Sequence, residues 1–434
     1  MIKKMLFILT SILIFSVGNA KDVWKILSFG EKGGLWDVQF INAYTGWAVG
    51  CFGTIEGGAS TILLTTDGGN NWLDQNPGTS VMLFSVYFTN SNNGWVVGKE
   101  GTILHTNDGG LNWSTKSLGE DIWLRSIFFI NDTIGWIVGY HDINNDPVLL
   151  YTSNGGEDWI IKTINFNDID IHQVVFVDEN NGWIAGGNSN LILHTTDAGE
   201  NWELQNTNGV KPIFSIYFTD ILNGWAVGGS YDRGVGCSDI ILHTIDGGKN
   251  WIVQSDGNNY QLFDIQFVDN INGWAVGGFP ALSCGTYTSV ILNTTDGGIN
   301  WEEQGVITES CLNGLFFSDA NNGWAVGVTN FGNEAILHTE IVDKVSEQNK
   351  QLFLEDNSFC SNNNSSIKYY LTEPGIIKLN LYDFLGNEIR EIEKFQEVGE
   401  HKETFNVDKN SSGIYYYIIQ IGNSLESGKL LLVK

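Results

Sequence analysis

Seven side chains at one repeated position of the sequence could line a binding site. Each stands four residues before a phenylalanine that ends a short apolar segment; they are Trp36, Phe84, Arg125, His172, Phe214, Phe263 and Asn313. Most of them are aromatic and suit packing. Arg125 and His172 depart from that pattern because they are polar, and they are the more suggestive of a ligand.

Asp37 and Asp264 follow one residue after two of these positions. A pair of carboxylates can hydrolyse a glycosidic bond, one acting as the acid and the other as the nucleophile or base. The alternative, which we favour, is that they are solvated polar groups of a channel. Both interpretations require the elements before each phenylalanine to converge on one axis.

Three motifs recur along the chain and predict such an arrangement. A Gly-Trp-x-x-Gly segment occurs at Trp47, Trp95, Trp136, Trp183, Trp225, Trp274 and Trp324. A turn of the Thr-x-Asp-Gly-Gly-x-x-Trp type follows the first six, ending at Trp72, Trp113, Trp159, Trp202, Trp251 and Trp301. The third motif is the apolar segment that ends in phenylalanine. Each unit reads as four short strands, which is typical of a β-propeller blade.

The seventh unit lacks the glycine-rich turn and its fourth strand. Asp22 to Leu27 resembles that missing strand without its turn, so it should pair into the last blade and close the ring. Closure removes exposed sheet edges. The sequence therefore predicts an all-β, seven-bladed β-propeller over residues 21–341. In it the tryptophans of the Gly-Trp motifs form inter-blade core rather than a sugar-stacking row.

The glycine-rich turn resembles the Asp-box of BNR repeats, and its aspartates are Asp67, Asp108, Asp197, Asp246 and Asp296. The carboxylate should accept backbone N–H groups of its own turn, while the glycines supply positive φ. A calcium loop would need several alternating carboxylates. The repeats over 31–340 resemble the photosystem II assembly-factor propellers. That resemblance implies a seven-bladed fold and a binding role, but not the partner, because the arginine-rich surface of that family is absent.

Loops between the second and third strands vary in length and should carry specificity on one face. They are longest in the fifth and sixth units, at Gly229 to Ile240 and Gly278 to Val290. Candidate ligand contacts on this rim are Tyr231, Asp232, Arg233, Phe279 and Tyr287, with Asp142 and Asp146 in the third unit.

The two ends of the chain resemble export signals. Residues 1–20 have a basic start, an apolar run and small residues at a cleavage point, as in a secretory signal peptide. After a linker at 342–352, residues 353–434 predict a small β-sandwich. This domain resembles the type A sorting domain of the type IX secretion system, in the motif residues Tyr382, Asp383, Gly386, Gly399, His401, Gly413, Tyr415 and Lys434. The resemblance implies that this domain is recognised by the type IX secretion machinery. The alternative is an unrelated adhesive sandwich.

The composition limits the classes of molecule that the protein is expected to bind. The net charge of −28 disfavours nucleic acid and anionic membrane surfaces. We expect no metal, no cofactor and no membrane span after signal cleavage. Cys237 and Cys284 could form a disulfide, although free buried cysteines are common. The sequence thus predicts a secreted or cell-surface binding protein for a protein or glycan. The alternative is an extracellular glycoside hydrolase of sialidase-like architecture, which would need three arginines where the propeller has two, Arg125 and Arg233.

Overall fold

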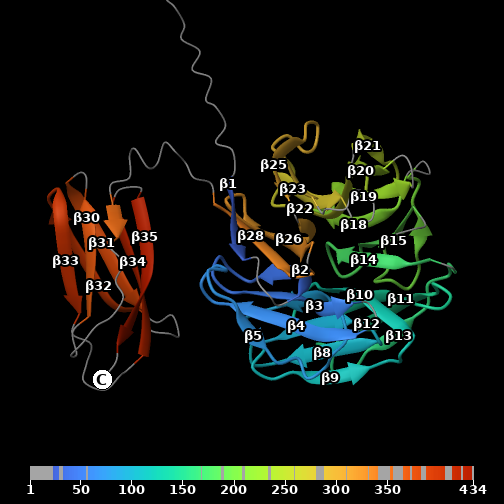
Figure 1. Cartoon of the computed structure of the whole chain (residues 1–434), viewed down its shortest axis with the longest axis horizontal. Coiled ribbons are helices and arrows are strands. Elements are labelled where there is room, and N and C mark those ends of the chain that lie inside the picture. Colours follow the sequence, from blue (N-terminus) through green and yellow to red (C-terminus); the bar gives the residue numbers. More distant parts are fainter. Residues whose placement is uncertain are drawn as a thin grey trace, which may run out of the picture. The chain divides into compact units, whose positions relative to one another are not determined.

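The computed structural model describes residues 23–28, 33–54, 57–167, 169–186, 190–207, 211–232, 236–258, 260–279, 288–308, 310–330, 332–340, 352–354, 365–371, 374–382, 388–405, 413–421 and 424–432. The chain divides into two compact units, one comprising Lys21–Ile341 and the other containing Val342–Lys434. All regular elements in the described residues are β-strands (Figure 1). Among these residues no helix is long and apolar enough to cross a membrane.

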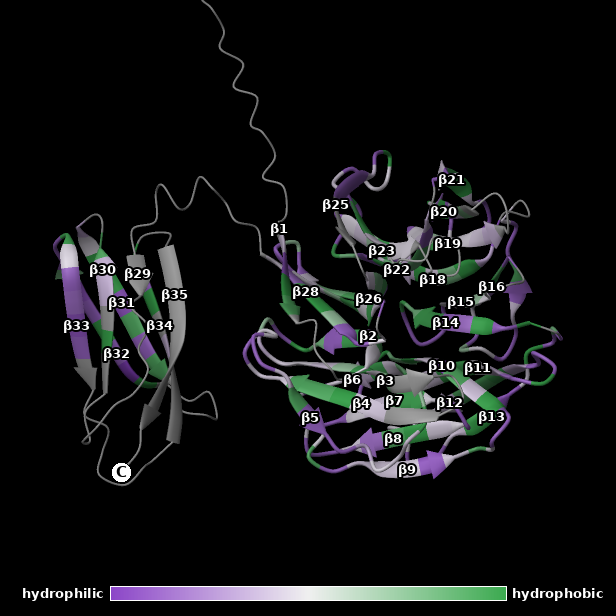
Figure 2. Cartoon of the chain, in the orientation of Figure 1, coloured by the Kyte–Doolittle hydropathy of each residue, from purple (hydrophilic) through white to green (hydrophobic). Residues whose placement is uncertain are grey.

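The first unit contains seven four-stranded antiparallel sheets, the blades. Blade 1 is β2 (Gly34–Phe40), β3 (Gly46–Thr54), β4 (Gly57–Thr65) and β5 (Leu73–Gln75). Blade 2 is β6 (Leu83–Phe88), β7 (Gly94–Gly98), β8 (Thr102–Thr106) and β9 (Ser114–Ser117). Blade 3 is β10 (Ile122–Phe129), β11 (Gly135–His141), β12 (Pro147–Thr152) and β13 (Ile160–Lys162). The outermost strands β5 and β9 are short, exposed and hydrophilic (Figure 2).

The remaining blades repeat this order. Blade 4 is β14 (Ile171–Phe176), β15 (Gly182–Gly186), β16 (Leu191–Thr195) and β17 (Glu203–Leu204). Blade 5 is β18 (Ile213–Phe218), β19 (Gly224–Asp232), β20 (Gly236–Thr244) and β21 (Ile252–Asp256). Blade 6 is β22 (Gln261–Phe267), β23 (Gly273–Phe279), β24 (Thr288–Thr294) and β25 (Glu302–Thr308).

Blade 7 combines the two ends of the propeller. It consists of β26 (Ser310–Asp319), β27 (Asn322–Thr329), β28 (Glu334–Glu340) and the N-terminal strand β1 (Val23–Ser28). β1 pairs antiparallel with β28, with Trp24 opposite Thr339. The Trp24 ring meets Phe317 edge to face at 5.9 Å. The prediction of seven blades closed by the N-terminal strand is confirmed.

One contact explains the Phe and Gly-Trp motifs together. In every blade the terminal phenylalanine stacks on the Gly-Trp tryptophan of the preceding blade, with ring centroids 3.5–4.1 Å apart. The series includes Phe40 of blade 1 on Trp324 of blade 7, so it runs around the whole ring. The same phenylalanine lies over the glycine of its own blade, where a Cβ would come within 2.3–2.6 Å of the ring. Glycine is therefore required at that position.

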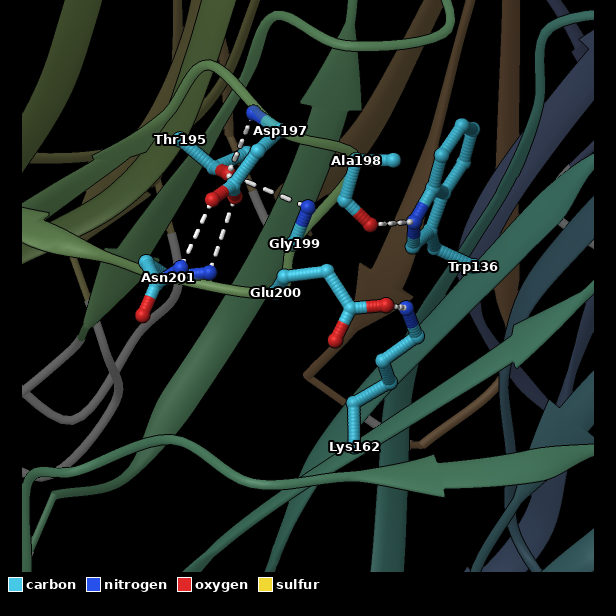
Figure 3. A network of polar contacts seen from close by, with 8 residues as sticks. All are labelled: Trp136, Lys162, Thr195, Asp197, Ala198, Gly199, Glu200 and Asn201. Atoms are coloured by element: carbon cyan, nitrogen blue, oxygen red, sulfur yellow. Dashed lines mark hydrogen bonds and ion pairs between the residues drawn. The ribbon is translucent and has the colours of Figure 1, made fainter.

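In blades 1, 2, 4, 5 and 6 the Asp-box turn fastens the blade to the one before it, as blade 4 illustrates (Figure 3). Asp197 Oδ1 accepts the Asn201 backbone N–H at 2.8 Å and the Thr195 hydroxyl at 2.9 Å. The turn so fixed presents the carbonyl of Ala198, which accepts the indole N–H of Trp136 in blade 3 at 3.3 Å (Figure 3). Thr195, Asp197 and Asn201 thus shape the turn.

The hairpins of blades 5 and 6 differ from the sequence prediction. Residues assigned to long loops instead extend the second and third strands. β19 and β20 stay paired out to Asp232 opposite Gly236, and β23 and β24 to Phe279 opposite Thr288. The expectation of strands limited to the Gly-Trp-x-x-Gly segment was wrong here, because the ladder continues past its last glycine.

The second unit is a two-layered β-sandwich. One sheet holds β29 (Leu352–Leu354), β30 (Ser365–Leu371) and β33 (Gly399–Phe405). The other holds β32 (Glu388–Gln396), β31 (Gly375–Tyr382), β34 (Gly413–Ile421) and β35 (Ser424–Leu432). Alternate residues of β30, β31 and β34, among them Tyr369, Leu379 and Ile419, fill its core. The predicted sandwich is confirmed.

Candidate functional site

A β-bulge in the innermost strand of every blade creates the site. The register shifts at the position four residues before the terminal phenylalanine, for example between Leu35 and Asp37 in blade 1. The bulge drives a backbone carbonyl toward the last glycine of the Gly-Trp motif. In six blades a Cβ there would lie 1.9–2.2 Å from that oxygen, and only blade 4, at Gly186, is looser. The motif's second glycine thus permits the bulge.

The bulged side chains line one cavity at the mouth of the central channel, with a volume of about 330 Å³. They are Trp36, Phe84, Arg125, His172, Phe214, Phe263 and Asn313. The rings touch along the wall: Trp36 meets Phe84 edge to face at 6.0 Å, and Phe214 stacks on Phe263 at 5.6 Å. The structure therefore brings together all the residues of this repeated position.

Arg125 is the cationic group of the cavity. Its guanidinium lies over the Phe84 ring, 4.4 Å from the centroid. Within the described residues it makes neither an ion pair nor a hydrogen bond, so its N–H donors stay available. Burial lowers the pKa of Arg125, and the nearby Tyr140 and Asp170 partly offset this. A half-buried guanidinium with free donors is suited to bind an anion.

His172 is the neighbouring polar group, in blade 4. Its Nε2 lies 3.5 Å from the Asp170 carboxylate, and the two side chains are 19% and 8% exposed. Burial lowers the pKa of His172; Asp170 opposes that effect and Arg125 adds to it. His172 is therefore neutral at neutral pH and can donate or accept a hydrogen bond. Asp170 and Tyr140 could not be found from the repeat pattern, because both lie outside the repeated position.

A belt of polar side chains, one step deeper than the bulges, forms the floor of this cavity. Its members are Asp37, Ser85, Ser126, Gln173, Ser215 and Asp264, with Gly314 at the seventh position. Each side chain accepts a backbone N–H from the next blade, as from Val86 to Asp37 at 2.9 Å and from Ile216 to Gln173 at 2.6 Å. A second cavity of about 260 Å³ lies beyond the belt.

Asp37 and Asp264 are belt members with both carboxylate oxygens engaged. Asp37 accepts the N–H groups of Val38 and Val86 at 2.8 and 2.9 Å. Asp264 accepts those of Ile265 and Leu315, at 2.9 and 2.8 Å, and the Ser215 hydroxyl at 2.8 Å. The pair therefore holds blades together. Asp37 also supplies the acceptor for its own blade that Gly314 cannot provide.

The environment perturbs both carboxylates. Burial raises the pKa of Asp37 to about 6. Burial raises the pKa of Asp264 to about 7, and the negative charge of Asp37 adds to that rise. The backbone N–H donors act in the opposite direction. Both carboxyl groups therefore lose their proton and become negatively charged as the pH rises through about 6 to 7.

The rim residues lie on the extended hairpins or outside the described residues. Tyr231 is half-buried opposite Cys237. Asp232 and Phe279 end β19 and β23. Asp142 and Asp146 lie in the hairpin of blade 3, where the Asp142 N–H donates to the Asp121 carbonyl. Arg233 and Tyr287 lie outside the described residues.

The remaining candidates are the other turn aspartates, the sandwich motif residues and the two cysteines. The other Asp-box aspartates, Asp67, Asp108, Asp246 and Asp296, make the same turn contacts as Asp197. In the sandwich, Tyr382, Gly399, His401, Gly413 and Tyr415 belong to strands, whereas Asp383, Gly386 and Lys434 lie outside the described residues. Cys237 is buried; Cys284 also lies outside, as do residues 1–20. Among the described residues no three His, Cys, Asp or Glu side chains could together hold a metal ion.

Comparisons with known proteins agree with this architecture. Residues 17–123 and 118–212 match the family model described as Photosynthesis system II assembly factor YCF48. YCF48 from Cyanidioschyzon merolae is 19% identical, with 74% of this chain and 99% of that chain covered and a TM-score of 0.54. YCF48 bound to D1 peptide is 18% identical, with 74% of this chain and 97% of that chain covered and a TM-score of 0.55.

The GH74 xyloglucanase from Xanthomonas campestris is 11% identical, with 87% of this chain and 60% of that chain covered and a TM-score of 0.53. No curated protein sequence matches the chain. In fold and in the repeats of its first half, the propeller is therefore similar to the YCF48 photosystem II assembly factors.

Proposed function

We propose that this chain is an exported binding protein whose propeller takes a protein ligand at the channel mouth. The observation that carries the proposal is Arg125, a half-buried guanidinium that makes no ion pair or hydrogen bond among the described residues, set in a cavity walled by aromatic rings. An acidic group of a polypeptide can occupy such a guanidinium while apolar side chains cover the rings. A structurally similar propeller, YCF48, has been solved with a D1 peptide bound.

A displayed library of random peptides, selected on the purified full chain, tests the proposal. Selected peptides should bind wild type and lose about tenfold to a hundredfold in affinity to Arg125→Gln, because a hydrogen bond to a charged group contributes about 1.5–3 kcal/mol. His172→Ala should weaken binding as well. Glu302→Gln, an exposed change on β25, is the matched control. Selected peptides that bind Arg125→Gln as tightly as wild type would refute the site.

Glycan binding and catalysis are the competing functions. The raised pKa values of Asp37 and Asp264 resemble those of glycosidase carboxylates, although their oxygens are engaged in blade contacts. A glycan array and a panel of chromogenic glycosides test both. Turnover by the wild type that is lost in Asp264→Asn, with the fold intact, would establish a hydrolase.

We also propose that residues 353–434 direct export through a type IX secretion system. The basis is the motif order together with the sandwich fold of the described part of this domain. Removing residues 353–434 should leave the propeller inside a host that has the secretion system, whereas the full chain reaches the medium or the cell surface. Equal export of both forms would leave the adhesive-sandwich alternative.

A further inference from the structure

The channel-mouth cavity has charged groups of opposite sign on different blades. Arg125 and His172 belong to blades 3 and 4. Asp264 belongs to blade 6 and Asp37 to blade 1, one on each side of blade 7. In a closed ring of seven, blade 3 faces the junction of blades 6 and 7. The arginine and the carboxylate pair therefore stand across the channel from each other.

The electrostatic couplings support two separate walls. The charge that acts on Asp264 is that of Asp37. The pKa of Arg125 responds to the nearby Tyr140 and Asp170. Arg125 lies on blade 3, whereas Asp37 and Asp264 lie on blades 1 and 6, on the other side of the ring.

The carboxylate wall can accept a cation. A carboxylate has about four lone-pair sites. Asp37 uses three, for the N–H groups of Val38 and Val86 and the Ser85 hydroxyl. Asp264 uses three as well, so each carboxylate keeps about one site for a ligand. Trp36 and Phe263, the bulge residues next to these aspartates, line the same cavity. Aromatic rings and carboxylates together favour an ammonium group.

We infer that the channel mouth binds a zwitterion, with its carboxylate on Arg125, its ammonium on the Asp37–Asp264 wall and an apolar body against the rings. The inference rests on the proposed function and names its ligand class: a short peptide with both ends free. A volume of about 330 Å³ lies at the small end of ligand pockets, which suits a dipeptide better than a longer chain.

Calorimetric titration of the full chain with the dipeptide Leu-Phe and its blocked forms tests this. The four probes are the free, N-acetylated, C-amidated and doubly blocked dipeptides, at pH 7.5 and low salt. We expect each block to weaken binding to wild type about tenfold or more. Asp264→Asn or Asp37→Asn should bind the free and acetylated forms alike, and Arg125→Gln the free and amidated forms alike. Glu302→Gln should behave as wild type.

The blocked probes need no mutation, so the inference can be refuted even if a variant fails to fold. Equal affinity of wild type for free and N-acetylated dipeptide would refute the zwitterion. If amidation alone weakens binding and Arg125→Gln abolishes that effect, the anion site of the proposed function stands without it. Absence of binding by all four probes would also refute the inference, while the library selection tests the proposed function separately.

Discussion

Replacing Asp264 with asparagine should change how the stability of the propeller depends on pH. The pKa of Asp264 is raised from 3.8 to about 7, chiefly by burial. The native state therefore holds a proton over a pH range in which the unfolded state has lost it. The stability associated with this proton is fully present below pH 3.8 and is lost as pH rises through about 7.

The magnitude follows from the size of the shift. About three pKa units at about 1.36 kcal/mol each give about 4 kcal/mol as the upper limit. Between pH 5 and pH 8 only the part that titrates from pH 5 to about 7 is lost, about 2–3 kcal/mol at most. At about 2 °C per kcal/mol for a domain of this size, the wild type should lose about 3–5 °C relative to Asp264→Asn.

Tryptophan fluorescence during thermal unfolding is the suitable assay. All 16 tryptophans lie between Trp24 and Trp324, so the signal reports on the propeller and not on the C-terminal sandwich. Titrations shared by both proteins cancel in the difference. Asparagine has one acceptor oxygen where the carboxylate has two, so a constant offset in Tm is expected. A difference in Tm that is the same at pH 5 and pH 8 would refute the reasoning.

Three further changes test the packing. Ala198 has a φ of +60°, where five equivalent residues are glycines, so Ala198→Gly should raise the free energy of unfolding by about 0.5–1 kcal/mol in denaturant titration; a loss of stability would contradict this. Gly314→Ala should lower the free energy of unfolding by about 1–3 kcal/mol, since its Cβ would lie 2.8 Å from the Trp36 carbonyl. Unchanged stability would mean that blades 7 and 1 can move apart at this contact. Deleting residues 23–28 should expose the edge of β28 and produce oligomers in size-exclusion chromatography; a monomer of unchanged stability would argue against closure by β1.

The repeat was predictable from the sequence because the glycines, tryptophan and phenylalanine of its motifs are required by contacts that recur around the ring. The first glycine makes room for the phenylalanine ring, and the tryptophan receives the ring of the next blade. The last glycine admits the carbonyl of the bulge. The position of the cavity residues followed from the same pattern, since a bulge at one repeated position points to the channel in every blade.

The role of the belt was not predictable. The sequence placed Asp37 and Asp264 near the channel, but their acceptor role depends on the neighbouring strand's backbone, which no single repeat contains. Gly314 leaves one position of the belt empty, and Asp37 compensates by accepting the N–H of Val38. Asp170, which pairs with His172, and Tyr140, which lies near Arg125, were missed because they lie outside the repeated position. The extended hairpin of β19 and β20 was missed because past the last glycine the residues carry no motif.

The first and last strands of the propeller lie side by side, with Val23 opposite Glu340, and all seven blade junctions use the same stacking of phenylalanine on tryptophan. The point at which the chain begins is therefore independent of the order of the blades around the ring. A circularly permuted gene, beginning at any connection between neighbouring blades and joining the present ends by a short linker, would encode the same ring with the same channel mouth. In this chain the first and last strands of the propeller meet in blade 7, and any of the seven blades could take that place.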